Sequence, residues 1–271
     1  MAFFKIFPKI GYDLKNTGVL QNVVNIYRSV RPLREFVDDI SAYKLYEIKN
    51  GERPDIVSQR LYGTPDYYWT FFIVNEYLHD GLASWPMSQE DLFNYMKTEY
   101  NGFAITTRPV VIRNTDQLVT DFQNSLAGRF TLGETITGSS SLATGTLTKK
   151  NIDMNQLIVQ DCTGAFQGDP NSVPNLVEVV TGSQSEDSVD TYEVFKYIDA
   201  PYSYYTEGDP EKRIQHNGVF VEGNEPSSDL KYITNRAHLE ESNDERSRMR
   251  VIAPEYITQF VDKFEELINN N

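Results

Sequence analysis

The segment Tyr46–Asn75 constrains the fold of this chain more than any other stretch. Alternating apolar positions over Lys44–Ile48 predict a strand, and Asn50-Gly51 predicts a turn after it, because glycine tolerates a positive φ. Pro54 suits the first turn of a helix, and Gly63 suits its end as a C-cap. A strand, a turn and a short helix with defined ends are therefore expected in close succession.

A second helix is expected directly after the first, and its surface is aromatic on nearly every side. Thr64 is the predicted N-cap, Pro65 the first helical residue, and the body runs to Asn75. Such a helix must be buried all round or must face a partner. Its rings could stack on sugars, but a protein core or a protein interface is the favoured interpretation. The aromatic side chains are Tyr67, Tyr68, Trp69, Phe71 and Phe72.

Composition excludes several classes of protein. The 271 residues suffice for one large domain or two to three small ones, and a hydrophobic content of 39% suffices for packed cores. The formal net charge of −14 disfavours a generic nucleic-acid role and docking on an anionic membrane, since both need clustered Lys and Arg. We therefore expect neither nucleic acid nor membrane as a partner.

Charge is unevenly distributed along the chain. Residues 1–34 carry six basic residues against Asp13, whereas acidic residues concentrate between Glu186 and Glu211. A basic arm on an acidic body would favour assembly with other subunits by electrostatic steering. A solvated surface with chance asymmetry is the alternative interpretation.

Cysteine content and hydropathy bear on location. The single Cys162 excludes an intrachain disulfide and a cysteine-based zinc site, and one thiol fits a reducing cytoplasm. The N-terminus lacks the apolar core of a signal peptide, and no apolar run approaches the roughly 20 residues of a membrane span. We expect a soluble protein without an export signal.

Four regions follow from the sequence pattern. Residues 1–42 are predicted as an N-terminal arm and helix, with helical spacing of apolar residues from Val19 to Val37. Residues 43–112 are predicted as the compact domain with a following helix that Ser88 caps. The other two regions begin where the composition changes, near residue 113.

Residues 113–188 are rich in Thr, Ser, Gly, Val and Leu, and they predict an inserted all-β domain, a small barrel or a sandwich. Gly182–Ser188 is its predicted exit linker. Residues 189–271 are predicted as an extended segment and an amphipathic C-terminal docking helix that begins at Pro254. The predicted fold class is therefore α+β. The inserted strands are expected at 130–138, 143–148, 157–159 and 176–180.

No pattern of side chains indicates catalysis, a cofactor or a metal. His79, His216 and His238 lack the spacing of metal ligands, and no glycine-rich phosphate loop is present. A glycosidase needs two carboxylates across a cleft, but with 39 acidic residues the presence of Glu52 or Asp55 selects nothing. We expect no enzyme, no cofactor and no metal.

Two resemblances rest on specific motifs. The glycine turn, the Arg60–Gly63 helix end, and Trp69 followed six residues later by Asn75 resemble a LysM module over residues 43–80. In their wider setting these motifs resemble the baseplate wedge subunit of T4-like contractile-tailed phages that carries a LysM-like domain. Matching segments span 1–112 and 190–271. The motifs are Phe7–Tyr12, Gly51–Val57, Tyr62–Trp69, Trp85–Ser88 and Arg250–Ile257 with the helix after it.

The resemblance implies a LysM-like βααβ domain in a non-enzymatic virion protein, assembled in the host cytoplasm. In that family the subunit joins wedge and inner-baseplate proteins and links adjacent wedges into a six-fold baseplate around the hub. The LysM-like fold serves protein contacts there, so glycan binding is not expected. Phe130–Gly138 and Ala143–Thr146 are similar to small β-modules on other phage virion proteins, and the partner of this insert stays open.

Partner contacts are expected on aromatic and basic residues of the matching segments. A tail-associated peptidoglycan-binding LysM protein is the alternative function, and a muralytic enzyme that depends on Glu52 or Asp55 is a third. The predicted contact residues are Phe7, Tyr12, Tyr27, Arg28, Tyr67, Trp69, Phe72, Trp85, Tyr256, Phe260 and Phe264.

Overall fold

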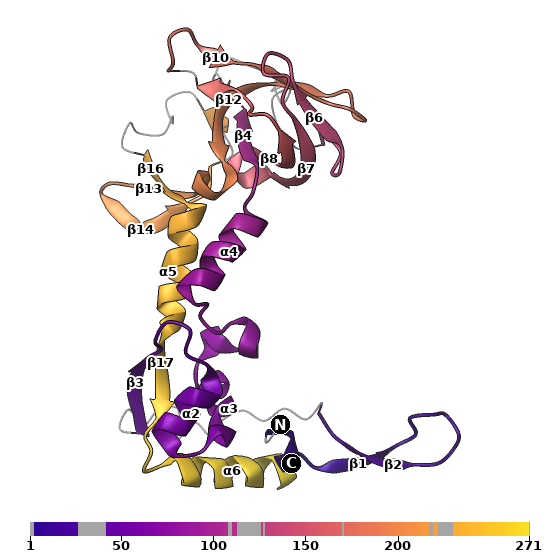
Figure 1. Ribbon diagram of the computed structural model, residues 1–271, viewed down its shortest axis with the longest axis vertical. Coiled ribbons are helices and arrows are strands. Elements are labelled where there is room, and N and C mark those ends of the chain that lie inside the picture. Colours follow the sequence, from indigo (N-terminus) through magenta and orange to yellow (C-terminus); the bar gives the residue numbers. More distant parts are fainter. Residues whose placement is uncertain are drawn as a thin grey trace. The chain divides into compact units, whose positions relative to one another are not determined.

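The computed structural model describes residues 3–26, 42–107, 110–112, 126, 128–169, 171–216, 219–221 and 230–270. Helices and strands are mixed along the chain, so the predicted α+β class is confirmed (Figure 1). The chain divides into two compact units. The first unit is Met1–Leu92 with Glu241–Asn271, and the second unit is Phe93–Glu240.

The first unit joins both ends of the sequence. Two helices cross the boundary between the units along the chain, α4 (Gln89–Glu99) and α5 (Asn235–Ser247). The other elements of the first unit are η1 (Phe3–Ile6), β1 (Lys9–Tyr12), β2 (Gln21–Val24), β3 (Tyr43–Glu47), α2 (Pro54–Tyr62), η3 (Pro65–Tyr67), α3 (Trp69–Val74), η4 (Glu76–Leu78), η5 (Gly81–Ala83), β17 (Arg248–Ile252) and α6 (Ile257–Asn270).

Local chemistry sets the ends of α2 as predicted. Pro54 occupies the first turn, and Gly63 adopts a left-handed C-cap with φ 72°, its N–H donating to the Gln59 carbonyl at 3.1 Å. Thr64 then accepts a hydrogen bond from the Asp66 N–H at 3.3 Å, which confirms it as an N-cap. The second helical segment begins as the short turn η3 and continues as α3.

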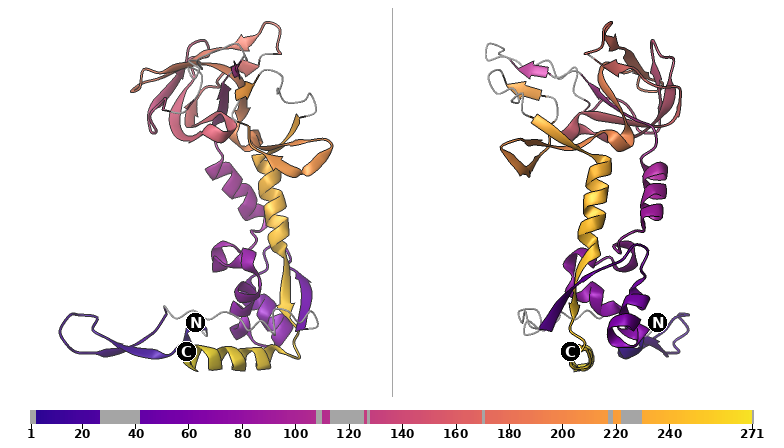
Figure 2. Two further views of the ribbon diagram at one scale, coloured as in Figure 1. Left: turned by 180° about the vertical axis from the view of Figure 1, so that it is seen from behind. Right: turned by 60° about the vertical axis from the view of Figure 1, so that its left-hand side comes forward.

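The strand β3 pairs with a strand from the far end of the chain. β3 and β17 run antiparallel, with Glu47 opposite Arg248 and Tyr43 opposite Ile252 (Figure 2). α2 and α3 lie between these strands in the chain, so β3, α2, α3 and β17 form a β-α-α-β set whose last strand is not consecutive. Its core contains Ile48, Val57, Phe71, Leu78, Met249 and Val251.

The N-terminal arm differs from its prediction. Residues 21–24 form the strand β2, which pairs with β1, where the apolar spacing predicted the start of a helix. Asp13 explains the hairpin turn, because its carboxylate accepts hydrogen bonds from the N–H groups of Lys15, Thr17 and Gly18. The remainder of the predicted helix lies outside the described residues.

The second unit contains a six-strand barrel, which confirms the small barrel among the two predicted β architectures. The strands close in the order β11-β12-β4-β8-β7-β6. β4, and β12 except for its first residue Ser188, lie outside residues 113–188, so flanking sequence completes the barrel. Buried Ile105, Ile136 and Leu147 lie in its core. The strands are β4 (Phe103–Thr107), β6 (Thr135–Gly138), β7 (Thr144–Asn151), β8 (Gln156–Thr163), β11 (Val179–Gly182) and β12 (Ser188–Lys196).

Smaller elements accompany the barrel. The stretch predicted as an extended segment contains a three-stranded sheet in the order β14-β13-β16. β5 (Val110–Ile112) and β15 (Val219–Val221) pair in parallel. The remaining elements are η7 (Ile152–Met154), β9 (Gly168–Asp169), β10 (Leu176–Val177), η8 (Tyr197–Asp199), β13 (Pro201–Thr206), β14 (Asp209–Ile214) and β16 (Leu230–Thr234).

The barrel contains the same short motif twice. Glu134–Ser141 and Glu178–Ser185 both read Glu-x-(Ile/Val)-Thr-Gly-Ser-x-Ser. The strands within the motifs, β6 and β11, pair antiparallel with Thr137 directly opposite Thr181. The residue after each motif has a positive φ, 56° at Leu142 and 57° at Glu186. The two copies are thus related by a local pseudo-twofold axis through the Thr137–Thr181 pair.

Each motif's glutamate caps the turn of the other motif. Buried Glu134 accepts hydrogen bonds from the N–H groups of Gln184 and Ser185, both at 2.9 Å. Buried Glu178 accepts from Ser140 and Ser141 at 3.1 and 2.9 Å. Gly182–Ser188, predicted as an exit linker, is therefore a capped turn between two barrel strands, and the linker prediction is wrong.

Candidate functional site

Four of the predicted contact residues meet in one cluster of the first unit. Phe7, Trp69, Phe260 and Phe264 are all buried there, and the Trp69 ring lies 4.9 Å from Phe264 and 6.3 Å from Phe260. Partly buried Tyr67 packs against the same cluster. The four buried rings hold distant segments of the chain together, and a partner would meet them only through the residues that cover them.

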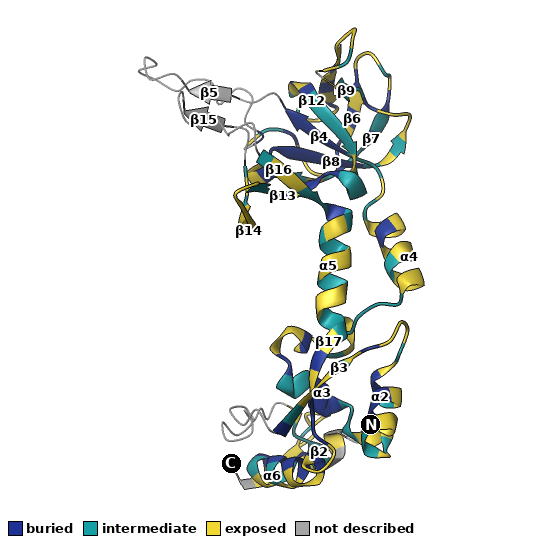
Figure 3. Cartoon of the chain, turned by 90° about the vertical axis from the view of Figure 1, so that its left-hand side faces the viewer, coloured by how far each residue is buried: buried dark blue, intermediate teal, exposed yellow. Residues whose placement is uncertain are grey.

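The C-terminal helix α6 docks on its own chain. Phe260, Val261, Phe264 and Ile268 face this cluster, whereas Thr258, Asp262 and Glu266 are exposed (Figure 3). The apolar stripe predicted from the sequence thus finds its groove in the first unit. Tyr256, just before the helix, stays on the surface with 39% of its area exposed.

Phe72 and Trp85 belong to a second cluster, around Phe71. The Trp85 ring lies 5.8 Å from Phe72 and 6.2 Å from Phe71, and its Nε1 donates to the Glu52 carbonyl at 2.7 Å. Both rings are half-buried. Trp85 therefore ties this cluster to the turn after β3, and part of each ring stays accessible.

The acidic residues considered for wall hydrolysis are engaged in structural contacts. The side chain of Glu52 is buried, accepts from the Tyr46 hydroxyl at 2.9 Å and the Lys49 N–H at 3.1 Å, and pairs with Arg60. Its Oε1 has no hydrogen bond of ordinary geometry, but the Arg60 guanidinium lies against it. Burial and the adjacent carboxylate raise the pKa of Tyr46. This network stabilises the turn between β3 and α2.

Asp55 is likewise engaged in a structural contact. It forms a bidentate ion pair with the Arg53 guanidinium at 3.0 and 3.1 Å. Arg53 is the N-cap position of α2, and Asp55 lies in its first turn, where the helix dipole favours an anion. The pair therefore stabilises the start of the helix.

Sequence reasoning missed the residues that hold β17 in place. The Asn75 side chain accepts from the Arg250 N–H at 2.8 Å and donates to the Arg250 carbonyl at 2.9 Å. The Tyr62 hydroxyl donates to the Ile252 carbonyl at 2.9 Å, and the Tyr77 hydroxyl donates to the Arg248 carbonyl. Burial raises the pKa of the Tyr62 hydroxyl, which keeps it a donor. The Trp69-to-Asn75 spacing was the available signal, but it could not reveal the partner strand.

The remaining predicted contact residues lie at the N-terminus. Tyr12 is 56% exposed on β1, next to other exposed apolar residues of the hairpin. Tyr27 and Arg28 lie outside the described residues. Among the described contact residues, Tyr12 and Tyr256 are the two most accessible to a partner.

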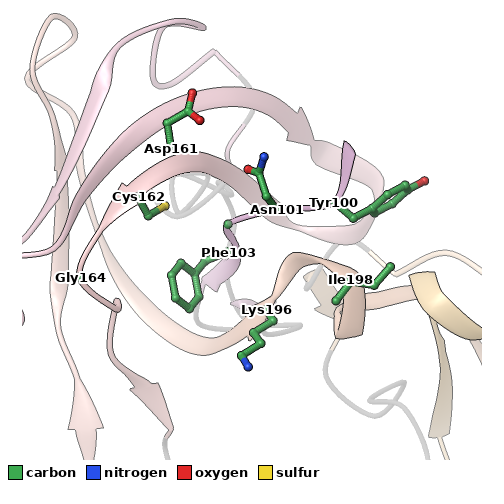
Figure 4. A pocket seen from close by; sticks show the side chains of 9 residues that line it. Tyr100, Asn101, Phe103, Asp161, Cys162, Gly164, Lys196 and Ile198 are labelled. Atoms are coloured by element: carbon green, nitrogen blue, oxygen red, sulfur yellow. The ribbon is translucent and has the colours of Figure 1, made fainter. Parts of the chain in front are cut away.

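A depression in the second unit offers no assembled site. It has a volume of about 420 Å³ and lies between Tyr100–Phe103 and the end of β8. Its polar side chains point in different directions, with Asp161, Tyr100 and Lys196 spread around the rim (Figure 4). Burial raises the pKa of the half-buried Cys162 thiol to about 11, so the thiol is protonated near neutral pH.

Within the described residues, the barrel strands leave no open sheet edge, and metal-ligating side chains do not cluster. The six barrel strands form a closed ring, so none of them presents a free edge to a neighbouring protein. In the described part of the chain, no three His, Cys, Asp or Glu side chains gather closely enough to hold a metal ion. No helix there is both long and apolar enough to cross a membrane.

Comparison with known families connects these features to a class of protein. Residues 2–113 match the family model described as base plate wedge protein 53. Over these residues the chain is similar to that family. The resemblance to a phage baseplate wedge subunit is thereby confirmed, and it indicates a structural protein of the phage tail. The match ends where the composition changes, and no curated protein matches the chain.

Proposed function

We propose that this chain joins wedge proteins to one another and links adjacent wedges around the hub of a six-fold baseplate, without enzymatic activity. The observation that carries the proposal is the match of residues 2–113 to the baseplate wedge family. Such a subunit acts by contact, so its fold must hold partner-facing segments in fixed positions. The protein would then work in the virion tail after assembly in the host cytoplasm.

The fold of the first unit supports extending this role to the C-terminal segment. Residues 248–252 pair with β3, and α6 packs on Trp69. Residues beyond the family match therefore complete the matched body. We include residues 241–271 in the same functional unit for this reason.

The LysM-like βααβ identity is part of the proposal. β3, α2, α3 and β17 supply two antiparallel strands and two helical segments, with the second strand taken from the C-terminal segment. Burial of Trp69 and Phe71 favours a use of this unit in protein packing over stacking on sugars.

Peptidoglycan binding is the second candidate, supported by the LysM-like motifs and the accessible part of Tyr67 and Trp85. Calorimetric titration of the purified protein with chito-oligosaccharides distinguishes the structural role from peptidoglycan binding. The structural role predicts no saturable heat. Micromolar affinity that is lost in Tyr67→Ala but kept in Tyr202→Ala, an exposed tyrosine of the second unit, would overturn it.

The direct test of the proposed function is co-purification. The tagged chain is expressed with the other wedge proteins of the same phage, purified, and crosslinked before mass spectrometry. We expect crosslinks from residues 2–113 and 241–271 to at least one wedge protein. Recovery of the chain free of every other tail protein, from infected cells and from virions alike, would contradict the proposal.

A further inference from the structure

The β1–β2 hairpin is an apolar arm with little support from its own chain. β1 pairs with β2, and among the described residues neither strand pairs with a third. A two-stranded hairpin is marginally stable in water unless something packs against it. The arm extends from the first unit as a ribbon (Figure 1).

The side chains of the arm are those of a contact surface. Leu20 is 71% exposed and covers Gly11 across the ribbon, where a Cβ on Gly11 would lie 3.5 Å from Leu20. Exposed apolar groups that gather on one element mark interaction sites more often than isolated ones do. The other exposed large apolar residues of the hairpin and its end are Ile10, Tyr12, Leu14, Val19 and Ile26.

Two further features suit the arm to a protein partner. The outer edges of β1 and β2 carry backbone N–H and C=O groups that a strand of another chain can pair with. Lys9 and Lys15 add positive charge, while the Asp13 carboxylate is engaged by the N–H groups of its own turn. These N–H groups lower the pKa of Asp13.

Charge points to the identity of the partner. The hairpin, residues 9–24, carries Lys9 and Lys15 against Asp13, although the whole chain has a formal net charge of −14. The rest of the chain therefore has a formal net charge of −15, opposite in sign to the net charge of +1 on the hairpin. We propose that the β1–β2 arm docks on the acidic surface of a second copy of this chain, so that successive copies link arm to body.

This inference rests on the proposed function, because it names the surface and the partner through which adjacent wedges would be linked. An arm that reaches from one copy to the next forms a heterologous contact, which closes into a ring when the rotation between copies allows it. Electrostatic attraction would speed the encounter, and the apolar side chains would hold the contact.

Sedimentation of the purified full chain over a range of concentrations tests the proposal. We expect association of the unmodified chain that weakens as salt is added, because the charged groups lie on the surface. Leu20→Asp should shift the association midpoint at least about tenfold, and Lys9→Glu with Lys15→Glu should weaken it and reduce its salt dependence. Leu176→Asp, on an exposed strand residue of the second unit, is the matched control and should change neither.

A carbodiimide crosslink between Lys and Asp or Glu identifies the receiving surface. Unlabelled and ¹⁵N-labelled chains are mixed, and crosslinks from Lys9 or Lys15 that join one labelled and one unlabelled peptide report contacts between copies. We expect such mixed pairs and expect Leu20→Asp to abolish them. Circular dichroism of each variant, compared with the unmodified chain, verifies that the fold persists.

Two outcomes overturn the proposal. One is a chain that stays monomeric at every accessible concentration, and the other is an association that Leu20→Asp leaves unchanged. If the chain is monomeric and the arm variants instead lose co-purification with another wedge protein, the partner is that protein. In that case the second copy is excluded while the proposed structural function stands.

Discussion

The two units of this protein are closed in different ways. The barrel of the second unit is built from residues 103–196, and its two turns are capped reciprocally by Glu134 and Glu178. The first unit is closed by β17 and α6, which return from the other end of the chain to meet β3 and Trp69. One unit therefore depends on contacts within a continuous segment, and the other on a segment remote in sequence.

This difference bears on assembly. The wedge-family region lacks β17 and α6 until the C-terminus has been synthesised. The entropic cost of bringing these remote segments together must then be overcome. The barrel can form its strand pairs while that closure is still missing. We therefore expect the two units to unfold as separate transitions.

The largest effect should follow from removing the returning segment. A chain that ends at Ser247 lacks β17 and α6, and with them the buried side chains Met249, Phe260 and Phe264. Each contributes roughly 1.5–3 kcal/mol of burial free energy, so the loss approaches the whole stability of a small unit. We expect calorimetry to lose the transition of the first unit and keep that of the second.

A chain that ends at Ile268 is the control, because it retains every buried residue of α6 that the structure describes. It should show both transitions. Limited proteolysis should release a stable fragment around residues 103–196 from the shorter chain. Survival of residues 43–92 as a protected fragment would mean that β17 is not needed to close the first unit.

A smaller effect is expected from Asn75→Ala. The change leaves the Arg250 N–H and C=O without their side-chain partner, and each buried unsatisfied group costs about 1–3 kcal/mol. Urea denaturation should therefore show a destabilised first unit and an unchanged barrel. Asn101→Ala, at an exposed residue of the second unit, provides the matched control. Equal destabilisation of both units would contradict their independent closure.

The paired caps allow an internal comparison within the barrel. Glu134→Gln and Glu178→Gln each replace a carboxylate that accepts several N–H groups by an amide with one acceptor oxygen. Hydrogen bonds to charged groups contribute about 1.5–3 kcal/mol, and we expect each variant to lose roughly that much barrel stability. The pseudo-twofold relation predicts similar losses for both, measured by urea denaturation. Exposed Glu186→Gln should be nearly neutral, and a large difference between the two caps would show that the turns are not equivalent.

Sequence reasoning succeeded where the determining chemistry is local. Pro54, Gly63 and Thr64 set helix ends through their own backbone preferences, and the structure places them as predicted. The Gly-Ser composition of residues 182–188 is equally compatible with a linker and with a capped turn. Only the remote carboxylate of Glu134 decides between them, and the repeated motif was the signal that could have suggested it.

The sequence could not reveal contacts between segments that lie far apart in the chain. Val23 and Val24 have helical spacing with their neighbours, but the Asp13 turn and Gly18 with φ 78° direct the chain into a hairpin. Nothing in residues 43–80 indicates that their second strand lies at 248–252. Trp69 and Phe71 lie in the core, as favoured for the aromatic helix, yet the sequence could not separate buried Trp69 from half-buried Trp85.

The smallest expected effect is a change in the pH dependence of the stability of the barrel. Burial would raise the pKa of Glu134, but hydrogen bonds from Ser185, Gln184 and Thr131 outweigh it and lower the pKa below the usual 4.5. A carboxyl with a lowered folded pKa contributes stability above its unfolded pKa and loses it as pH falls through the folded value. Barrel stability should therefore be level down to about pH 4.5 and decline below it.

In Glu134→Gln this contribution is absent at every pH, so urea midpoints measured from pH 7 to pH 3 should fall less steeply than in the unmodified chain. A parallel decline in both proteins would assign the acid sensitivity to other carboxylates.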